Sequence, residues 1–304
     1  MRNAIITGAN GFIGNILTKK LLDCGVTVTA IDLPETDKEF ISRKGVSFLG
    51  ADLNNLNSIL NDIPFDTDVL YHLAWRGVKA DLRNDYNLQI SNLNLCINII
   101  NMAFIKRVKK IIMLGSASQY IKSNEPINGY NQPSPIEAYG AVKHAAFIIC
   151  KTLAEQNKMN LIWTTVTSLY GPGRDDNNVL SYAIKMLLKG DKPSFTPLEQ
   201  IWDYIYIDDF INALYLIGLY GHAGKNYAIA NGDARVLKDY ITVIRDNIDP
   251  SLPLGVGEIQ YKDGFAENSI FNIDELKMDT GFYPKYSFED GIINVINYFR
   301  DNNK

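Results

Sequence analysis

The first half of the chain alternates short runs rich in β-branched residues with longer segments in which apolar positions recur three and four residues apart. That alternation predicts strands connected by amphipathic helices. The predicted strands cover residues 3–7, 26–31, 46–49, 68–73, 110–114 and 161–166. The predicted helices cover residues 12–23, 88–104 and 139–156. Apolar strands that alternate with helices indicate a parallel sheet covered on both faces, which is a doubly wound α/β fold.

The pattern changes after residue 170. A turn rich in glycine and proline precedes an apolar helix at 179–188, and later segments are shorter and richer in Gly, Pro and Tyr. We therefore expect a Rossmann domain in residues 1–170 and a smaller α/β substrate lobe in residues 171–304. The two parts are expected to be partly interleaved, because residues 203–230 are predicted to return to the large domain.

Composition restricts the class of protein. The 304 residues are 46% hydrophobic and 21% charged, with a formal net charge of −4, which is typical of a soluble globule and gives no basic surface for nucleic acid. No apolar run reaches the roughly 18–20 residues that span a bilayer, and the first strand starts too early for a signal peptide. We expect a cytoplasmic protein without a membrane partner or a metal site. Three cysteines in apolar helical stretches are expected to be buried, reduced thiols: Cys24, Cys96 and Cys150.

A glycine-rich turn, Thr7-Gly8-Ala9-Asn10-Gly11-Phe12-Ile13-Gly14, joins the first strand to the first helix. Gly8 permits the tight turn, Gly11 lets a pyrophosphate approach the backbone, and Gly14 lets the helix pack close to the sheet. The helix N-terminus also offers free N–H groups to phosphate. The turn therefore predicts a dinucleotide cofactor, which is expected to contact Asn10, Phe12 and Ile13 as well.

Asp32 ends the second predicted strand. A carboxylate at this place accepts hydrogen bonds from the ribose hydroxyls and repels a 2′-phosphate. No basic residue follows closely, since the next residues are Leu33, Pro34 and Glu35. The sequence therefore favours NAD over NADP. After the third strand, the expected contacts to the adenine are Asp52 and Leu53.

Tyr139 and Lys143 are four residues apart and share one face of a predicted helix. A free phenol has a pKa of about 10 and is a poor base at neutral pH. A nearby ammonium and the positive nicotinamide ring stabilise the phenolate, and the lysine can also hold the nicotinamide ribose. Ser116, at the end of the fifth strand, could hydrogen-bond the reacting oxygen. These three residues predict chemistry between an alcohol and a ketone.

These motifs resemble those of the extended short-chain dehydrogenases/reductases, in particular the nucleotide-sugar epimerase/dehydratase group. The resemblance covers nearly the whole chain and implies that Ser116, Tyr139 and Lys143 are the catalytic triad. It also implies that Leu73 and Ala74 line the cofactor cleft and that Asn92 supports the active-site backbone from the helix behind it. Further matching segments are Asp52-Leu53, His72-Leu73-Ala74, Tyr170-Gly171-Pro172 and Tyr204–Asp209.

Departures from the family pattern restrict the reaction. Family dehydratases carry an acidic pair directly after position 116, whereas Ala117 and Ser118 stand here, so dehydration is disfavoured. Many epimerases have a diphosphate-binding arginine where Trp202 stands, and tryptophan cannot neutralise phosphate. Packing is the simpler interpretation of Trp202, although it could stack on a base or sugar. The candidate residues for the sugar nucleotide, including Arg174 and Lys262 as replacement cations, are Trp75, Arg76, Ser118, Ser168, Arg174, Asn178, Trp202 and Lys262.

Two reactions fit the triad. In a ketoreductase, hydride passes from NAD(P)H to a sugar 4-ketone while Tyr139 supplies the proton. In a redox-neutral 4-epimerase, a retained NAD⁺ takes the hydride from carbon 4 and the same hydride returns to the other face. Many epimerases also carry arginine where Thr165 stands. The short chain, the missing arginines at Thr165 and Trp202, and the segment 258–284 favour reduction of a nucleotide-linked 4-keto-6-deoxyhexose for surface polysaccharide. A non-catalytic cofactor sensor is disfavoured, because such proteins typically lose Tyr139 or Lys143.

The resemblance also implies a homodimer, held by a four-helix bundle to which each subunit contributes two helices. In this chain the two helices are those at 88–104 and 139–156. A helix that faces a sheet needs apolar residues as well, so the sequence does not separate the two demands. The apolar candidates for the bundle are Met102, Phe104, Phe147 and Ile148.

Overall fold

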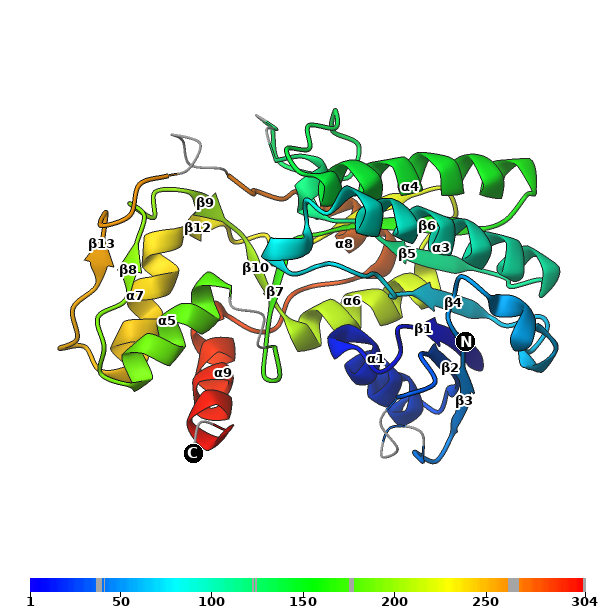
Figure 1. The fold of residues 1–304 in the computed structure, drawn as a ribbon, viewed down its shortest axis with the longest axis horizontal. Coiled ribbons are helices and arrows are strands. Elements are labelled where there is room, and N and C mark those ends of the chain that lie inside the picture. Colours follow the sequence, from blue (N-terminus) through cyan, green and yellow to red (C-terminus); the bar gives the residue numbers. More distant parts are fainter. Residues whose placement is uncertain are drawn as a thin grey trace.

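A seven-stranded parallel sheet forms the centre of the larger part of the molecule (Figure 1). The computed structural model describes residues 1–36, 40, 42–121, 123, 125–174, 178–261 and 268–302. The strand order is β3-β2-β1-β4-β5-β6-β11, which confirms the predicted doubly wound sheet. The strands are β1 (Asn3–Thr7), β2 (Thr27–Asp32), β3 (Val46–Gly50), β4 (Val69–His72), β5 (Ile111–Leu114), β6 (Leu161–Val166) and β11 (Asn226–Ile229).

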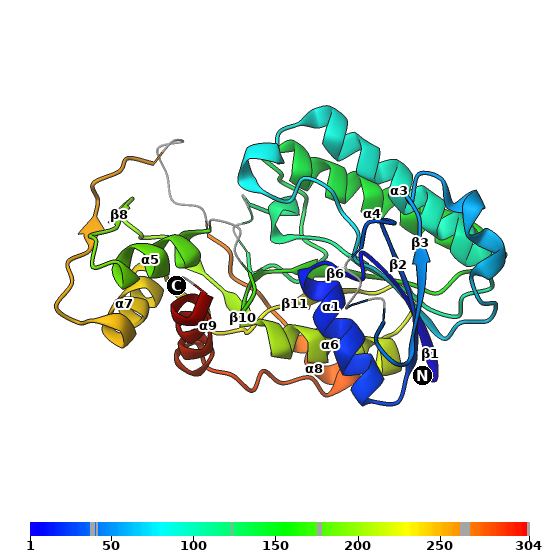
Figure 2. The same cartoon turned by 60° about the horizontal axis from the view of Figure 1, so that its bottom comes forward.

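Helices cover both faces of this sheet, as Figures 1 and 2 show. On one face α3 (Tyr86–Ile105) lies beside α4 (Ala138–Gln156), and on the other face α1 (Phe12–Asp23) lies beside α6 (Ile207–Tyr220). Each face has its own buried apolar core, and consecutive strand residues alternate between them. Ile5, for example, belongs to one core and Ile6 to the other. This explains why the sheet strands are apolar on both sides.

The carboxyl ends of the parallel strands meet at one edge of the sheet. After β1 the chain continues to β2 and β3 on one side, and then returns to β4 on the other side of β1. In sheets of this order, ligands bind outside the carboxyl ends at the point where the winding reverses. The last residues of β1 and β4 are Thr7 and His72, which are paired in register with their side chains 2.7 Å apart.

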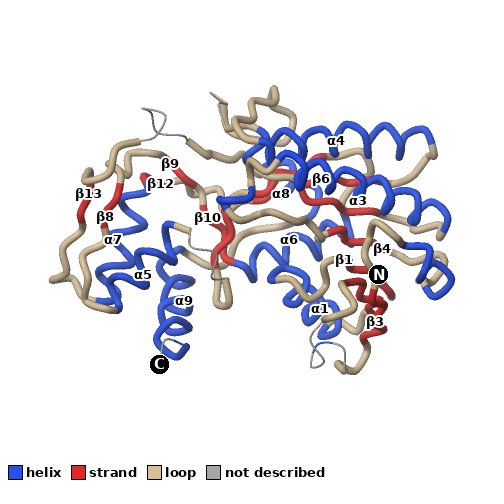
Figure 3. The backbone as a smooth tube through the Cα atoms, viewed as in Figure 1, coloured by secondary structure: helices blue, strands red, loops and turns tan. Residues whose placement is uncertain are grey.

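The smaller part of the molecule holds the C-terminal helix and lies at the end remote from β3 (Figure 3). Its helices are α5 (Val179–Leu188), α7 (Leu237–Ile248) and α9 (Phe288–Asn302). Its strand pairs are β7 (Ser168–Tyr170) with β10 (Tyr204–Tyr206), β9 (Ile201–Trp202) with β12 (Arg235–Val236), and β8 (Ser194–Phe195) with β13 (Gly255–Val256).

The chain passes between the two parts more than once. After β10 it returns to the large sheet through α6 and β11, and α8 (Asp274–Thr280) later packs against both of these elements. The segment 203–230 therefore contributes to the large sheet, although β10 itself pairs in the smaller part. The division of the chain at residue 170 stays a prediction.

One predicted placement is wrong, and one open choice is decided. Cys24 is exposed, because it caps the C-terminus of α1 and does not lie on its apolar face, whereas Cys96 and Cys150 are buried as expected. Met102, one of the apolar candidates for the bundle, is only 2% exposed and belongs to the core beneath α3. Phe104 remains exposed on the same helix, so the structure separates the two roles that the sequence could not.

The apolar character of α3 also exceeds what the sequence analysis expected. By length and composition alone, Tyr86–Ile105 is long and apolar enough to cross a membrane, and 44% of the window that passes this test is buried inside the fold. The core helix of a soluble protein passes the same test, so this is a weak indication. In this fold the buried side of α3 packs on the sheet and on α4.

Candidate active site

The glycine turn after β1 is packed against the loop that follows β4. Gly8 has a φ of +69°, and a Cβ there would lie 2.7 Å from the backbone nitrogen of Ala74. A Cβ on Gly14 would lie 2.1 Å from the carbonyl oxygen of Gly8. Gly11 is different, because it is exposed, has a φ of −68° and would bring its Cβ no closer than 3.2 Å to a neighbour. Packing requires glycine at the first two positions and leaves Gly11 as the open approach to the turn.

The N-terminus of α1 and Asp32 complete this crevice. The first backbone N–H groups of α1, from Phe12 and Ile13, have no partner within the helix and can bind phosphate. The Asp32 carboxylate accepts hydrogen bonds of 2.8 Å from the backbone nitrogens of Asn10 and Leu33, so it also fixes the turn. These groups fit the pyrophosphate and ribose of a dinucleotide.

Asp52 and Arg76 lie against each other at the exposed end of the crevice. Arg76 Nη2 is 3.1 Å from Asp52 Oδ2, and both side chains are more than one-third exposed. The backbone N–H of Asn54 lowers the pKa of Asp52, and Arg76 acts in the same direction. Leu53 is buried, with its carbonyl bonded to Asn98 Nδ2 at 3.0 Å. A residue expected at the adenine and one expected at the sugar are therefore direct neighbours.

Ser116 begins the short 3₁₀ turn η4 (Ala117–Gln119) after β5. Its Oγ accepts a hydrogen bond of 3.2 Å from the Ser118 backbone, and its own N–H donates to Gln119 Oε1 at 2.9 Å, which is a capping box. The turn lies close to α4, since a Cβ on Gly140 would be 2.1 Å from the Ser118 carbonyl oxygen. Because of this close packing, the Ser116 hydroxyl reaches the phenol of Tyr139.

Tyr139 is buried in the first turn of α4. Burial raises the pKa of its phenol, whereas the nearby Arg83 charge and a hydrogen bond with Ser116 act against that rise. The Arg83 guanidinium lies 5.2 Å from the Tyr139 ring centroid and 3.2 Å from Glu137 Oε1. With its pKa raised, the phenol is protonated at neutral pH and can donate a proton.

Lys143 lies one turn further along α4. Its Nζ donates a hydrogen bond of 2.7 Å to the carbonyl of Leu114, the last residue of β5. The same nitrogen is 3.6 Å from the Trp75 ring centroid and 5.9 Å from the Tyr139 ring centroid. Burial lowers the pKa of this lysine to about 7. The ammonium therefore lies closest to the end of β5 and to Trp75.

Asn92, on α3, holds the loop that follows β4. Its Oδ1 accepts a hydrogen bond of 2.8 Å from the backbone nitrogen of Arg76, and its Nδ2 donates to the Arg76 carbonyl at 3.0 Å. The side chain is fully buried. At the start of the same loop, the Leu73 nitrogen donates to the Thr7 carbonyl at 3.1 Å, and Ala74 follows against Gly8. Trp75 therefore lies between Ala74 and Arg76, and these contacts fix the backbone at both of those residues.

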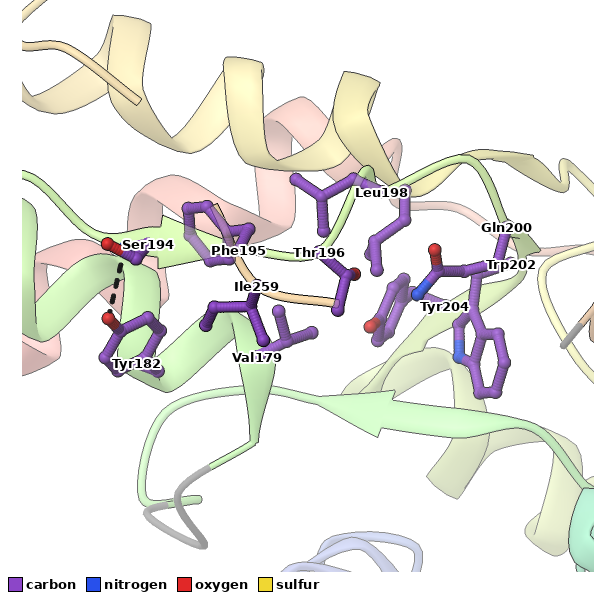
Figure 4. Close-up of a pocket in the computed structure, with 11 residues that line it drawn as sticks. Val179, Tyr182, Ser194, Phe195, Thr196, Leu198, Gln200, Trp202, Tyr204 and Ile259 are labelled. Atoms are coloured by element: carbon purple, nitrogen blue, oxygen red, sulfur yellow. Dashed lines mark hydrogen bonds between the residues drawn. The ribbon is translucent and has the colours of Figure 1, made fainter. Parts of the chain in front are cut away.

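A pocket of about 610 Å³ lies in the smaller part of the molecule (Figure 4). Aromatic and aliphatic side chains from α5, β8, β9, β10 and α7 form most of its wall, and its described lining residues include no charged side chain. Gln200 and Trp202 lie at one end of it, and Tyr182 and Ser194 lie at the other. The wall is composed of Val179, Tyr182, Ser194, Phe195, Thr196, Leu198, Gln200, Trp202, Tyr204, Leu237 and Ile259.

The other candidate substrate residues divide between this pocket and structural contacts. Trp202 lines the pocket, and its Nε1 donates a hydrogen bond of 2.9 Å to Ser168 Oγ. Asn178 caps α5, with its Oδ1 accepting from the backbone of Leu180 and Ser181. The guanidinium of Arg174 bonds to the Leu169 carbonyl and lowers the pKa of Tyr139. Lys262 lies outside the described residues.

Arg83 is the residue at this site that the sequence analysis missed. It follows the 3₁₀ turn η3 (Ala80–Leu82), and its carbonyl accepts the Tyr139 N–H at 2.9 Å while its guanidinium lies over the phenol ring. No local pattern marks it, because the two residues are far apart in the chain. The only sequence hint is a cation that follows the fourth strand on the same edge of the sheet.

The fold and this arrangement define the class: the molecule is an extended short-chain dehydrogenase/reductase. Residues 4–230 match the family model described as the NAD dependent epimerase/dehydratase family. Because that match covers most of the chain, the protein belongs to this family.

Known relatives of the chain carry several activities. It is 26% identical over 298 residues to the CDP-abequose synthase of Salmonella typhimurium, with 95% of each chain covered. It is also 26% identical over 321 residues to the UDP-N-acetyl-alpha-D-glucosaminuronate decarboxylase of Bacillus cytotoxicus, covering 99% of this chain and 98% of the other. Among solved structures, the UDP-glucose 4-epimerase of Thermotoga maritima superposes with a TM-score of 0.86 at 20% identity, covering 99% and 100%.

Proposed function

We propose that this protein reduces the 4-keto group of a nucleotide-linked 4-keto-6-deoxyhexose, with a nicotinamide cofactor that supplies the hydride. The observation that carries the proposal is the placement of Tyr139. Its buried phenol lies against the Ser116 hydroxyl and beneath the Arg83 guanidinium, where it is protonated at neutral pH and can donate that proton. Reduction of a ketone requires such a donor, because the new alkoxide must be protonated.

The residues around Tyr139 support this direction of reaction. The Ser116 hydroxyl can donate a hydrogen bond to the ketone oxygen, and Arg83 and Lys143 stabilise the phenolate that remains after proton transfer. Ala117 and Ser118 follow Ser116, so the turn has no carboxylate to eliminate water. Dehydration is therefore not part of the proposal.

The apolar pocket supports a substrate that is anchored to the protein through a nucleotide. Its aromatic walls suit the flat faces of a base, and Gln200 and Thr196 supply hydrogen-bonding groups at its edge. Trp202 stands where many family members have a diphosphate-binding arginine, so the phosphates require a cation from elsewhere. We assign that role to Arg174, whose charge already reaches Tyr139. The relative named for a CDP-sugar makes CDP-linked substrates the first to test.

We assign NAD rather than NADP to the crevice, on the ground of Asp32. Its carboxylate lies at the end of β2 and is fixed by Asn10 and Leu33, where a 2′-phosphate would meet its charge. The test is a comparison of the Michaelis constants for NADH and NADPH in wild type and Asp32→Ala. The alanine variant is expected to accept NADPH better relative to NADH.

Two measurements on the purified protein test the reduction. The first is consumption of NADH or NADPH with CDP-, UDP- or dTDP-linked 4-keto-6-deoxyglucose. The second is release of bound cofactor after denaturation. Steady loss of reduced cofactor with formation of a 4-hydroxy sugar supports the proposal. Tightly held NAD without any consumption of NADH or NADPH overturns it.

A redox-neutral 4-epimerase is the second candidate, and Asp32 is the observation that favours it. An epimerase retains NAD through the cycle, and the fixed carboxylate suits a tightly held NAD. The two candidates differ in their product. An epimerase interconverts two 4-hydroxy sugars without net consumption of cofactor, which is detected by NMR of the sugar anomeric signals.

A further inference from the structure

Trp75 makes direct contact with Tyr139 and Lys143, the two residues of α4 that belong to the expected triad. The Lys143 Nζ lies 3.6 Å from the centroid of its ring, which is within the range of a strong cation–π contact. The Tyr139 ring meets it edge to face, with centroids 6.0 Å apart and planes at 88°. One indole therefore touches the proton donor and the lysine beside it.

The orientation of this indole is fixed by Gln89. Trp75 Nε1 donates a hydrogen bond of 3.0 Å to Gln89 Oε1. Gln89 is fully buried, and its Nε2 donates to the carbonyls of Gly77 and Leu82 at 2.8 and 3.1 Å. Because both ends of this amide are bonded, its oxygen must face Trp75. The ring is thus held with its face toward Lys143.

Lys143 needs such a contact, because it is buried with one carbonyl partner. Leu114 supplies that carbonyl, and no salt bridge to Lys143 is found among the described residues. Burial lowers the pKa of this lysine to about 7, although Cys96 acts in the opposite direction, and a π face also favours the charged form. Several titratable and charged groups surround Lys143. Cys96 acts on Lys143 directly, and His72 and Cys150 lie behind Cys96. The groups on the side of the phenol are Tyr139, Arg83, Glu137 and Arg174.

We propose that Trp75 is a positioning residue whose ring favours the ammonium form of Lys143 beside Tyr139. The ring takes the place of the carboxylate that usually accompanies a buried lysine. Trp75 acts through Lys143 on the phenol and transfers no proton itself. The consequence for turnover rests on the proposed ketoreduction, whereas the consequence for the charge of Lys143 does not.

The first test measures the charge of Lys143 without any substrate. Protein labelled with ¹³C at the lysine ε carbon is titrated by NMR, and the Lys143 signal is assigned from its absence in Lys143→Met. Trp75→Leu is expected to lower the titration midpoint by about one pH unit, and Trp75→Phe by less than half of that, because phenylalanine keeps a π face. An unchanged or raised midpoint in Trp75→Leu overturns the proposal.

A matched control removes a different ring from the same helix. Phe147 packs on Trp163 with centroids 5.4 Å apart and has no contact with the Lys143 ammonium among those described. Phe147→Leu is expected to leave the Lys143 midpoint in place, even if it lowers the melting temperature. A shift equal to that of Trp75→Leu would mean that loosened packing is the cause, and the proposal fails.

The second test concerns turnover, and it separates this inference from the proposed function. In the pH profile of kcat/KM, the alkaline limb of Trp75→Leu is expected to move to lower pH by the same amount as the NMR midpoint, with Trp75→Phe restoring most of it. If the NMR midpoint moves but no ketoreductase activity exists, the proposed function fails and the role of Trp75 stands. If the enzyme is active and the NMR midpoint does not move, the role of Trp75 fails and the function stands.

Discussion

The phenol of Tyr139 is the group on which the proposed chemistry depends. Burial raises the pKa of this phenol, whereas Arg83 and Ser116 act in the opposite direction. Because the phenol is uncharged, removing its hydroxyl deletes the proton donor without deleting a charge. We expect Tyr139→Phe to reduce turnover by about 10²–10⁴-fold, the usual contribution of a general acid. Cofactor binding, measured by fluorescence quenching on titration with NADH, should change little, because the crevice at Gly11 and Asp32 is untouched.

A matched control for this change is Tyr71→Phe. Tyr71 is fully buried in β4, and its hydroxyl donates to the Leu214 carbonyl at 3.3 Å on the α6 face of the sheet, opposite the face covered by α4. Its loss should cost about 1 kcal/mol of unfolding free energy and leave turnover intact. Wild-type turnover in Tyr139→Phe would show that another group supplies the proton.

Lys143 makes the stability of the fold depend on pH. Its folded pKa of about 7 is below the ordinary lysine pKa of 10.5, so between these two values the unfolded chain binds more protons than the folded protein. Stability from this residue is therefore lowest below about pH 7 and rises up to about pH 10. Urea denaturation of wild type and Lys143→Met should show their difference changing in favour of wild type over that window, by up to about 1.4 kcal/mol per pH unit. A constant difference would mean that Lys143 titrates alike in both states.

Two glycines of the strand–turn–helix unit at the N-terminus have different roles, because Gly14 is required for packing and Gly11 leaves the approach to the cofactor crevice open. Gly14→Ala places a Cβ 2.1 Å from the Gly8 carbonyl, so α1 must move and about 1–3 kcal/mol of stability should be lost. Gly11→Ala places its Cβ 3.2 Å from the Gly8 carbonyl, a tight contact that small shifts relieve, so it should lower the melting temperature much less than Gly14→Ala. Its methyl group lies at the exposed approach to α1, so NADH binding should weaken about tenfold or more, which is about 1.4 kcal/mol. Unaltered NADH affinity in Gly11→Ala would place the cofactor elsewhere.

The elements of the large sheet could be predicted because each contains enough residues to show a period. Leu161–Val166 is buried throughout and is apolar except for Thr164 and Thr165. The helix Val179–Leu188 of the smaller part is also long enough to show a clear helical stripe. The strands of the smaller part could not be predicted in this way. Ile201–Trp202 and Arg235–Val236 have two residues each, and they are strands only because they pair with each other across the fold.

The same limit applies to the site. The sequence indicates Gly8 and Gly14 because the turn that they make is local, and it indicates Asp32, Ser116, Tyr139 and Lys143 because their order resembles that of a known family; their roles at the site stay predictions. The contact of Arg83 with Tyr139 and that of Trp75 with Lys143 connect distant segments, so only the folded chain reveals them. The sequence could name Trp75 as a candidate at the sugar pocket, but it could not tell that its ring faces a lysine.

The exposed faces of α3 and α4 bear on how whole molecules associate. Ile90 on α3 and Ile148 on α4 are 53% and 49% exposed, and Tyr86 is 67% exposed at the start of α3. The two helices lie side by side on the sheet, so their outer sides form one surface (Figure 2). Apolar side chains on such a surface are expected to be covered in solution. We therefore propose a homodimer in which α3 and α4 of two copies form a four-helix bundle.

This association predicts that Ile90→Glu combined with Ile148→Glu yields a monomer. Two carboxylates per subunit would be buried beside their symmetry mates, and the cost of desolvating unpaired charge exceeds what the bundle gains. Light scattering after gel filtration should give twice the chain mass of 34.1 kDa for wild type and one chain mass for the double variant. Ile293→Glu, at a 44% exposed position on α9, should remain a dimer and serves as the control. A double variant that stays dimeric, with an unchanged melting temperature, would move the interface away from α3 and α4.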